Sequence, residues 1–222
     1  MSLHNNIFVC PICKLTLRFG ICEKCASDFS KTDSSVLSYI CRDMYQSEAE
    51  YNHAMRVIDF WGAGWKKRLT EIDHKFLYEL NKQKLYERVK NQLNIAHSEN
   101  SLMSKVKFPM NVNQIALNIG CGAGSEALIL AGQGAFCVAM DITSPAAEAA
   151  QSLVRKIGEG VGIQADARFI PMSDDSVDIV YSSGVLHHSQ NLEKSLSEIF
   201  RVLKPGGVAY IMLYATWSLI FM

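Results

Sequence analysis

The sequence has no excess of either charge, because 22 lysine and arginine residues balance 22 aspartate and glutamate residues among 222 positions. This balance argues against a protein dedicated to binding polyanions, although the mildly basic N-terminal half keeps RNA open as a partner. No apolar run is long enough to span a bilayer, and the N-terminus lacks a basic patch followed by an apolar stretch. We therefore expect a cytoplasmic protein without a membrane span.

Cysteine, by contrast, is plentiful, with seven residues in the chain. In a cytoplasmic protein, this content indicates metal ligands or free thiols rather than a disulfide framework. Hydrophobic residues make up 49% of the sequence, which is enough for a sizeable core. The length allows one full domain and a small appendage.

Three segments of the chain differ in their residue pattern. Residues 1–40 combine cysteines with turn-forming residues and predict a zinc ribbon. Residues 41–110 predict a helical segment and a linker, with apolar residues at helical spacing: Ile72, Phe76, Leu77, Leu80 and Leu85. Residues 111–222 alternate β-rich runs with helical runs, which predicts an α/β fold with a doubly wound, mostly parallel sheet.

The alternation in the third segment predicts the positions of individual strands and helices. Strands are expected at 114–119, 135–140, 161–164, 177–182 and 207–213. Helices are expected at 125–132, 145–157 and 191–203. The run Lys204-Pro205-Gly206-Gly207 marks the end of the last helix, because a cation in the final turn and a following proline are typical of helix ends.

A glycine-rich loop, Gly120-Cys121-Gly122-Ala123-Gly124, follows the first of these strands and precedes a helix. Glycine lets the backbone turn sharply and approach a ligand, and the helix N-terminus offers free N–H groups. The loop alone is compatible with a dinucleotide site, since Gly122, Gly124 and Ala127 fit the GxGxxA variant. Asp141 also ends the second strand at about the distance expected for a ribose-binding carboxylate.

Further motifs decide between these alternatives. They occur in one order along the chain: Leu117–Gly124, Met140–Ile142, Ala165–Ala167, Ile170–Val180, Ser182–His188 and Arg201–Gly207. With this order and spacing, residues 114–214 resemble the class I S-adenosylmethionine (SAM)-dependent methyltransferases, and in particular the methyltransferase type 11-like domains. The resemblance implies SAM as the cofactor.

The resemblance also implies which residues bind SAM: Gly120, Cys121, Gly122, Gly124, Asp141, Ile142, Asp166, Ala167 and Ser182. It implies that Gly120 and Gly122 pass against the methionine part of SAM. Asp141 is expected to hold both ribose hydroxyls, and Asp166 to accept a hydrogen bond from the adenine amino group. The carbonyl of Ser182 is expected to face the methionine ammonium.

Asn118 departs from the family pattern, because the family usually has an acidic residue at this place. Asparagine keeps the capacity to form hydrogen bonds and loses the charge. This departure keeps another class of function open, a non-catalytic SAM-binding or zinc-ribbon interaction module.

The methyl acceptor is less well defined by the sequence. Trp61 and Trp65 are candidates for lining the acceptor site, since N-terminal helices of the family often cover the SAM pocket. His187 and His188 follow the fourth strand, but a general base is needed only for a protonated oxygen or carbon acceptor, so no catalytic residue is assigned. We expect a small-molecule acceptor or a glycan or lipid precursor, with an RNA base as the alternative.

Two CxxC pairs near the N-terminus predict a metal site. Cys10 and Cys13 form the first pair, and Cys22 and Cys25 form the second. Four thiolates complete a tetrahedral zinc shell and leave no open position, so the zinc is expected to be structural. We expect the ribbon to take no part in methyl transfer, and a chain that starts near residue 40 to keep its SAM affinity.

The C-terminus lacks part of the family pattern. The family sheet has seven strands, whereas the pattern in this chain ends after the fifth. We therefore expect the C-terminal strands to be missing. The apolar run at 219–222 is then expected to leave an uncovered edge, open to a partner or to self-association.

Overall fold

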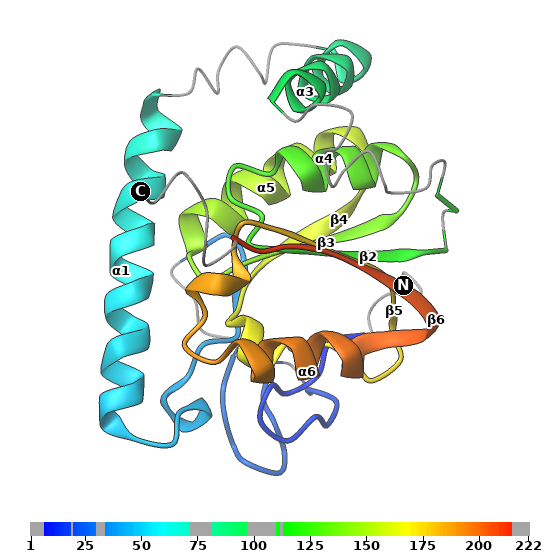
Figure 1. Cartoon of the computed structure of the whole chain (residues 1–222). Helices are drawn as coiled ribbons and strands as arrows, with labels where there is room; N and C mark the ends of the chain where they lie inside the picture. The colour runs from blue at the N-terminus through cyan, green and yellow to red at the C-terminus, as the bar shows by residue number, and fades with distance from the viewer. Residues whose placement is uncertain are drawn as a thin grey trace.

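The computed structural model describes residues 7–18, 20–29, 34–71, 81–96, 110–111 and 113–214. Within these residues, six strands form one sheet in the order β1-β4-β3-β2-β5-β6, and every neighbouring pair runs parallel. The strands are β1 (Leu37–Ser38), β2 (Ile115–Ile119), β3 (Phe136–Asp141), β4 (Glu159–Gln164), β5 (Val177–Ser183) and β6 (Leu203–Met212). The helices are α1 (Glu48–Glu71), α3 (Lys82–Ala96), α4 (Ser125–Gly132), α5 (Ser144–Ile157) and α6 (Leu192–Val202), with 3₁₀ turns η1 (Arg42–Met44), η3 (Ala167–Phe169) and η4 (Leu186–His188) (Figure 1).

Helices cover both faces of the sheet, as the predicted α/β fold requires. In Figure 1, α3, α4 and α5 lie above the sheet, and α6 lies below it. Buried side chains of α4 and α5 form one core with the upper face, and Ile199 and Val202 of α6 form another with the lower face. The central strands β2 and β3 are buried along their whole length, which explains why they read as continuous apolar runs.

The predicted strands and helices of the third segment are confirmed, with shifted ends. The largest difference is at β6, which begins at Leu203 rather than at 207. Its pairing with β5 steps from Val177↔Leu203 to Ile179↔Val208, so the residues between form a bulge. Gly206 has a φ of 81° and Pro205 has no N–H to donate, and both features interrupt regular pairing.

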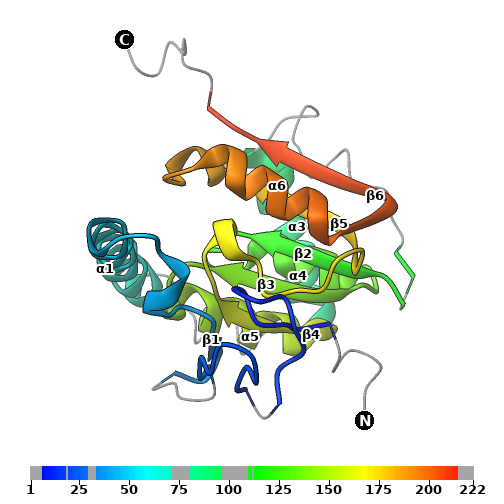
Figure 2. The ribbon, with the colours of Figure 1, turned by 90° about the horizontal axis from the view of Figure 1, so that it is seen from below.

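The N-terminal segment is packed against the sheet and does not stand apart as an appendage. Its strand β1 pairs with β4, with Leu37 opposite Ile163, and the pattern of the sequence did not indicate this strand. Ile7 and Phe29 are buried in the same core as the lower face of the sheet. Figures 1 and 2 show this segment beside α6, and an ion pair of 2.7 Å joins Lys14 to Glu198 of that helix.

Several predictions fall on residues outside the described part of the chain. They concern the apolar positions Ile72, Phe76, Leu77 and Leu80, the linker at 101–109 and the C-terminal run at 219–222. Leu85, which belongs to the same periodic pattern, is fully buried in α3 against the core around α4.

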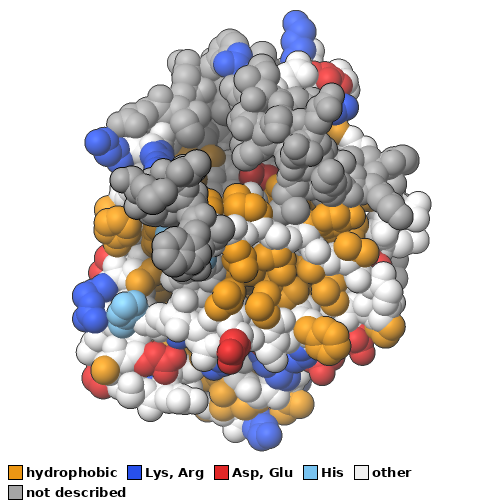
Figure 3. Space-filling model, in the orientation of Figure 1, with side chains coloured by type: hydrophobic (Ala, Val, Ile, Leu, Met, Phe, Trp, Pro, Cys, Tyr) orange, Lys and Arg blue, Asp and Glu red, His pale blue; other side chains and the backbone are white. Residues whose placement is uncertain are grey.

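The edge formed by β6 carries exposed hydrophobic side chains. Val208 on this strand is 46% exposed, and Phe200 on α6 is 82% exposed. Figure 3 shows hydrophobic side chains gathered over β6. No helix among the described residues is both long enough and apolar enough to span a membrane.

Candidate cofactor and metal sites

The glycine loop begins where β2 ends and has the sharp geometry that the sequence predicts. Gly120, Gly122 and Gly124 have φ angles of 69°, 51° and 89°, in the left-handed region that favours glycine. The N–H groups of Gly120 and Cys121 both donate to the carbonyl of Met140, at 2.8 and 3.1 Å. These bonds hold the loop against the end of β3, and α4 starts directly after Gly124.

A cavity of about 510 Å³ lies at the carboxyl ends of the strands, between the glycine loop and α1. This volume suits a small ligand, and the carboxyl edge of a parallel sheet is where ligands of such folds bind. Most of the predicted SAM-binding residues line it: Gly120, Cys121, Gly122, Asp141, Ile142, Asp166 and Ala167.

Gly124 and Ser182 are not among the residues that line the cavity. Gly124 packs instead against α5, where an added Cβ would lie 2.6 Å from the Cα of Ala150. Ser182 is fully buried within β5, and the next residues, Ser183 and Gly184, line the cavity in its place.

Asp141 ends β3 with its carboxylate at the floor of the cavity. The side chain accepts hydrogen bonds from the N–H of Gly122 at 3.2 Å and from the N–H and hydroxyl of Thr143, both at 2.9 Å. Burial raises the pKa of Asp141, and these hydrogen bonds partly oppose the rise. The residue therefore joins the glycine loop to the start of α5 and presents acceptor oxygens to the cavity.

Asp166 is held by an arginine that the sequence analysis did not single out. The guanidinium of Arg168 contacts both carboxylate oxygens of Asp166, with a shortest distance of 2.7 Å, and also donates to Glu50 of α1 at 2.8 Å. The side chains of Arg168 and Asp166 are 4% and 5% exposed. The Asp-x-Arg spacing is visible in the sequence, but Glu50 lies 118 residues away, so only the fold brings this pair together.

Asn118 lies under the glycine loop as a buried polar residue. Its amide nitrogen donates to the carbonyl of Tyr181 at 3.3 Å, whereas its side-chain oxygen has no hydrogen-bond partner within the described structure. A buried acceptor without a partner is unusual, and a donor group such as an ammonium fits it. Asn118 does not itself line the cavity, so this acceptor lies behind the residues that do.

One face of α1 closes the cavity. Ala54, Val57, Trp61, Trp65 and Arg68 line it, at spacings that place them on the same side of the helix. The ring of Trp65 covers the glycine loop, because a Cβ added to Gly122 would lie 2.6 Å from that ring. Both tryptophans thus line the cavity, and their role at the acceptor site stays a prediction.

The two histidines differ in their surroundings. His188 lines the cavity and lies 5.2 Å from Trp61, between ring centroids. The ring of His187 lies against that of Tyr214, with centroids 4.1 Å apart and planes tilted by 33°, and neither ring nitrogen has a hydrogen-bond partner in the described part of the chain. Burial and the neighbouring His188 lower the pKa of His187. Within the described part of the chain, no hydrogen bond orients either histidine as a base.

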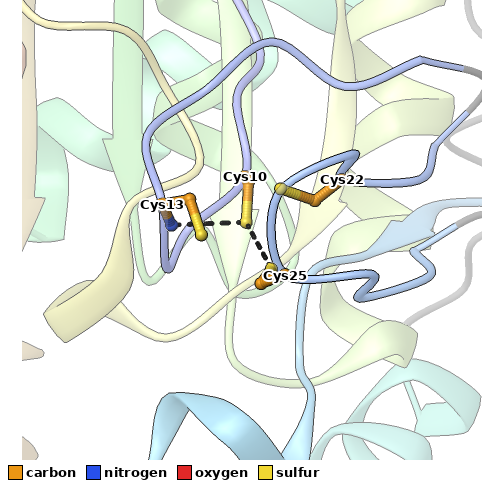
Figure 4. Close-up of side chains that lie close together, drawn as sticks. All are labelled: Cys10, Cys13, Cys22 and Cys25. Atoms are coloured by element: carbon orange, nitrogen blue, oxygen red, sulfur yellow. Dashed lines mark hydrogen bonds between the residues drawn. The ribbon is translucent and has the colours of Figure 1, made fainter.

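The four predicted metal ligands converge at the tip of the ribbon (Figure 4). The sulfur atoms of Cys10, Cys13, Cys22 and Cys25 all lie within 4.8 Å of one another, and those of Cys10 and Cys25 are 3.7 Å apart. A tetrahedral zinc with Zn–S bonds of about 2.3 Å places its sulfurs about 3.8 Å apart, so the arrangement fits zinc.

The thiols of this cluster differ in acidity. Burial raises the pKa of Cys10 to about 12. At Cys25 burial acts in the same direction, but hydrogen bonds with Ser27 and neighbouring cysteines outweigh it and lower the pKa to about 6. A thiol that ionises near neutral pH is a ready metal ligand.

Comparison with known proteins shows which families the C-terminal part of the chain is similar to. Residues 117–211 match the family described as "Methyltransferase domain". Over 110 residues the chain is 35% identical to malonyl-[acyl-carrier protein] O-methyltransferase of Methylococcus capsulatus, covering 48% of this chain and 40% of that protein. Over 93 residues it is 37% identical to the uncharacterized methyltransferase YcgJ of Bacillus subtilis, covering 41% of this chain and 37% of that one.

The crystal structure of YcgJ is also similar, with 28% identity and a TM-score of 0.44 over 49% of this chain and 46% of that one. The chain thus spans about two fifths of the length of the curated relatives named above. The matched residues contain the glycine loop, Asp141 and Asp166, all of which line the cavity. Residues 117–211 are therefore similar to SAM-dependent methyltransferase domains.

Proposed function

We propose that this chain transfers a methyl group from SAM to a small-molecule acceptor or to a glycan or lipid precursor. The observation that carries the proposal is the convergence of the glycine loop, Asp141 and Asp166 on one cavity at the carboxyl edge of the sheet. The relatives act on varied small or carrier-linked acceptors by name, including malonyl-[acyl-carrier protein] and demethylmenaquinone.

The chain's own residues would bind and orient the cofactor. Asp141 would accept hydrogen bonds from ribose hydroxyls, and Asp166 would accept one from the adenine amino group. Bound SAM supplies an electrophilic methyl group on a sulfonium, so the protein's main task is to align the acceptor and exclude water. Trp61 and Trp65 on α1 suit this task because they close the cavity with apolar rings.

The test of this proposal uses labelled SAM with fractionated cell extract. Transfer of label to a small-molecule fraction supports the proposal, and the labelled product then identifies the acceptor. Calorimetry should also show tighter binding of SAM than of NADH. SAM binding without transfer to any fraction would favour a non-catalytic SAM-binding module, and tighter binding of NADH would contradict the cofactor assignment.

Asp141→Ala is expected to weaken SAM binding by about 1–3 kcal/mol, or roughly 5- to 150-fold, because hydrogen bonds to the ribose are lost. Isothermal titration of the variant and the unaltered chain measures the change. The matched control is Asp59→Ala, which removes an exposed carboxylate from α1 outside the cavity. Equal SAM affinity in all three proteins would refute the ribose assignment.

We further propose one structural zinc per chain, bound by Cys10, Cys13, Cys22 and Cys25. Elemental analysis of protein purified without chelator is expected to give about one zinc per chain, since four sulfurs complete the shell. Cys41→Ser is the matched control, because this cysteine lies outside the cluster and its loss should leave the zinc content unchanged. Metal content near zero in the unaltered chain would rule the site out.

The proposed organisation of the chain keeps the three segments predicted from the sequence. These are the zinc ribbon at 1–40, the helical segment and linker at 41–110, and the SAM-binding domain at 111–222. The shared core between the ribbon and the sheet supports one addition, that the ribbon is a structural part of the domain's lower face.

A further inference from the structure

A buried ion-pair network joins the covering helix α1 to the turn that follows β4. Arg168 in η3 is its centre, with Asp166 on one side and Glu50 on the other. Both Asp166 and Arg168 line the cavity, whereas Glu50 lies near the start of α1. The network therefore connects the proposed adenine end of the cavity to the helix that closes it.

The contacts between Arg168 and Asp166 fix the orientation of the carboxylate. The backbone N–H of Arg168 donates to one oxygen at 2.9 Å, Nε contacts both oxygens at 3.1 and 3.2 Å, and Nη2 donates to the other at 2.7 Å. A planar guanidinium that contacts both oxygens of a carboxylate restricts its rotation as well as its position. The carboxylate of Asp166 thus has one well-defined plane.

One acceptor position of Asp166 is only weakly used. The hydroxyl of Tyr45 donates to this carboxylate at 3.5 Å, at the long limit for such a bond. A carboxylate offers about four lone-pair positions. The shorter hydrogen bonds to Asp166 all come from Arg168. Asp166 lines the cavity and Tyr45 does not, so an incoming donor, such as an aromatic amino group, would reach this carboxylate from the cavity side.

The second arm of the network reaches α1. Nη1 of Arg168 donates to Glu50 at 2.8 Å, and its guanidinium lies 5.4 Å from the ring centroid of Tyr45 and 5.7 Å from that of Phe169. These rings and the surrounding backbone leave Arg168 only 4% exposed. The position of the arginine is therefore determined from both the η3 side and the α1 side.

Stability alone does not explain the network. Desolvation makes a buried ion pair weak evidence for stability, because apolar residues of similar volume often serve as well. Lys194 of α6 also lies beside this cluster, with its Nζ 3.5 Å from the ring centroid of Phe169, so two cations face the two carboxylates. The Asp166 carboxylate nevertheless keeps acceptor capacity, which suits a group that receives a hydrogen-bond donor from a ligand.

We infer that Arg168 is a positioning residue for adenine recognition, and that Glu50 couples this positioning to α1. Arg168 holds the Asp166 carboxylate in the plane that receives the 6-amino group of adenine. Glu50 holds Arg168 in place when α1 covers the cavity. The inference rests on the proposed function, since it requires a ligand with an adenine base.

The test compares two ligands that differ at one position of the base. S-adenosylhomocysteine carries a 6-amino donor, whereas S-inosylhomocysteine carries a 6-oxo acceptor that the carboxylate disfavours. The ratio of their dissociation constants is measured by calorimetry for the unaltered chain, Arg168→Gln and Arg168→Lys. The ratio is expected to fall by about tenfold in Arg168→Gln, because the carboxylate is no longer held, and by less in Arg168→Lys.

Arg201→Gln is the matched control for a loss of stability. Arg201 pairs with Glu198 and Asp174, donates to the carbonyls of Ile170 and Met172, and does not line the cavity. This variant is expected to lower the melting temperature and leave the ligand ratio unchanged. An unchanged ratio in both Arg168 variants, or an equal fall in Arg201→Gln, would overturn the inference while leaving the proposed function in place.

Glu50→Gln tests the arm that reaches α1 and leaves the contacts between Arg168 and Asp166 in place. S-adenosylhomocysteine is expected to slow hydrogen exchange along α1 in the unaltered chain, and to do so several-fold less in this variant. Equal protection of α1 in both proteins would overturn the coupling. If the unaltered chain binds neither ligand, the proposed function fails, and this inference fails with it.

Discussion

Replacing both Cys10 and Cys22 with serine is expected to remove the bound zinc and to destabilise the domain by about 3–5 kcal/mol. Both cysteines are fully buried, and a segment of about 30 residues cannot bury a sufficient core by itself. Since 1 kcal/mol corresponds to roughly 2–4 °C in a chain of this size, the melting temperature should fall by about 6–20 °C. Elemental analysis and thermal unfolding measure the two effects.

The damage is expected to extend from the ribbon to the cofactor site because the two share backbone contacts. The N–H of Val9 donates to the carbonyl of Pro171 at 3.1 Å, and that of Ser173 donates to the carbonyl of Ile7 at 2.8 Å. Residues 171–173 follow directly after η3, which carries Arg168. Loss of the ribbon should therefore weaken SAM binding, contrary to the expectation that a chain starting near residue 40 keeps its affinity.

Cys41→Ser provides the comparison for this double variant. Cys41 is half-buried and lies outside the metal cluster, so its replacement should leave the zinc content unchanged and the melting temperature within a few degrees. The zinc ribbon would lose its assigned role if the double variant kept its metal. It would also lose that role if the double variant melted at the same temperature as Cys41→Ser.

The parts of the fold that the sequence predicts well are those with a local signal. The strands β2 and β3 are buried on both faces, so their apolar runs are continuous and their ends are marked by glycine and aspartate. The metal cluster is also local, since each pair of cysteines lies on one tight turn. Strand β1 has only two residues, and its pairing with β4 depends on contacts that no periodic pattern reports.

The candidate site shows the same division. The glycine loop and Asp141 follow directly from their places at strand ends. The sequence analysis expected Asp166 to meet adenine and did not indicate the network around it, because Glu50 lies 118 residues from Arg168 and only the fold brings the two together. The motif assigns Gly124 to the ligand, whereas in the structure this residue packs against α5 and does not line the cavity.

Gly124→Ala is expected to destabilise the domain by about 3–5 kcal/mol. We expect it to be the most destabilising alanine substitution among the glycines of the loop. The residue has a φ of 89°, so any side chain adds strain, and the new Cβ would lie 2.6 Å from the Cα of Ala150. A collision with the backbone of α5 cannot be relieved by rotating a side chain. The helices α4 and α5 would have to separate, and the glycine loop at the start of α4 would move with them.

Gly206→Ala separates the backbone strain from the collision. Gly206 has a similar φ of 81°, but nothing lies within 4 Å of an added Cβ, so only the strain of about 1–2 kcal/mol is expected. Urea unfolding gives the free energy of unfolding of each variant, and the difference between the two variants measures the packing of α4 on α5. An equal decrease in both variants would show that backbone strain alone accounts for glycine at position 124. A larger loss for Gly124→Ala, together with weaker SAM binding, would show that close packing of these helices holds the cofactor loop in place.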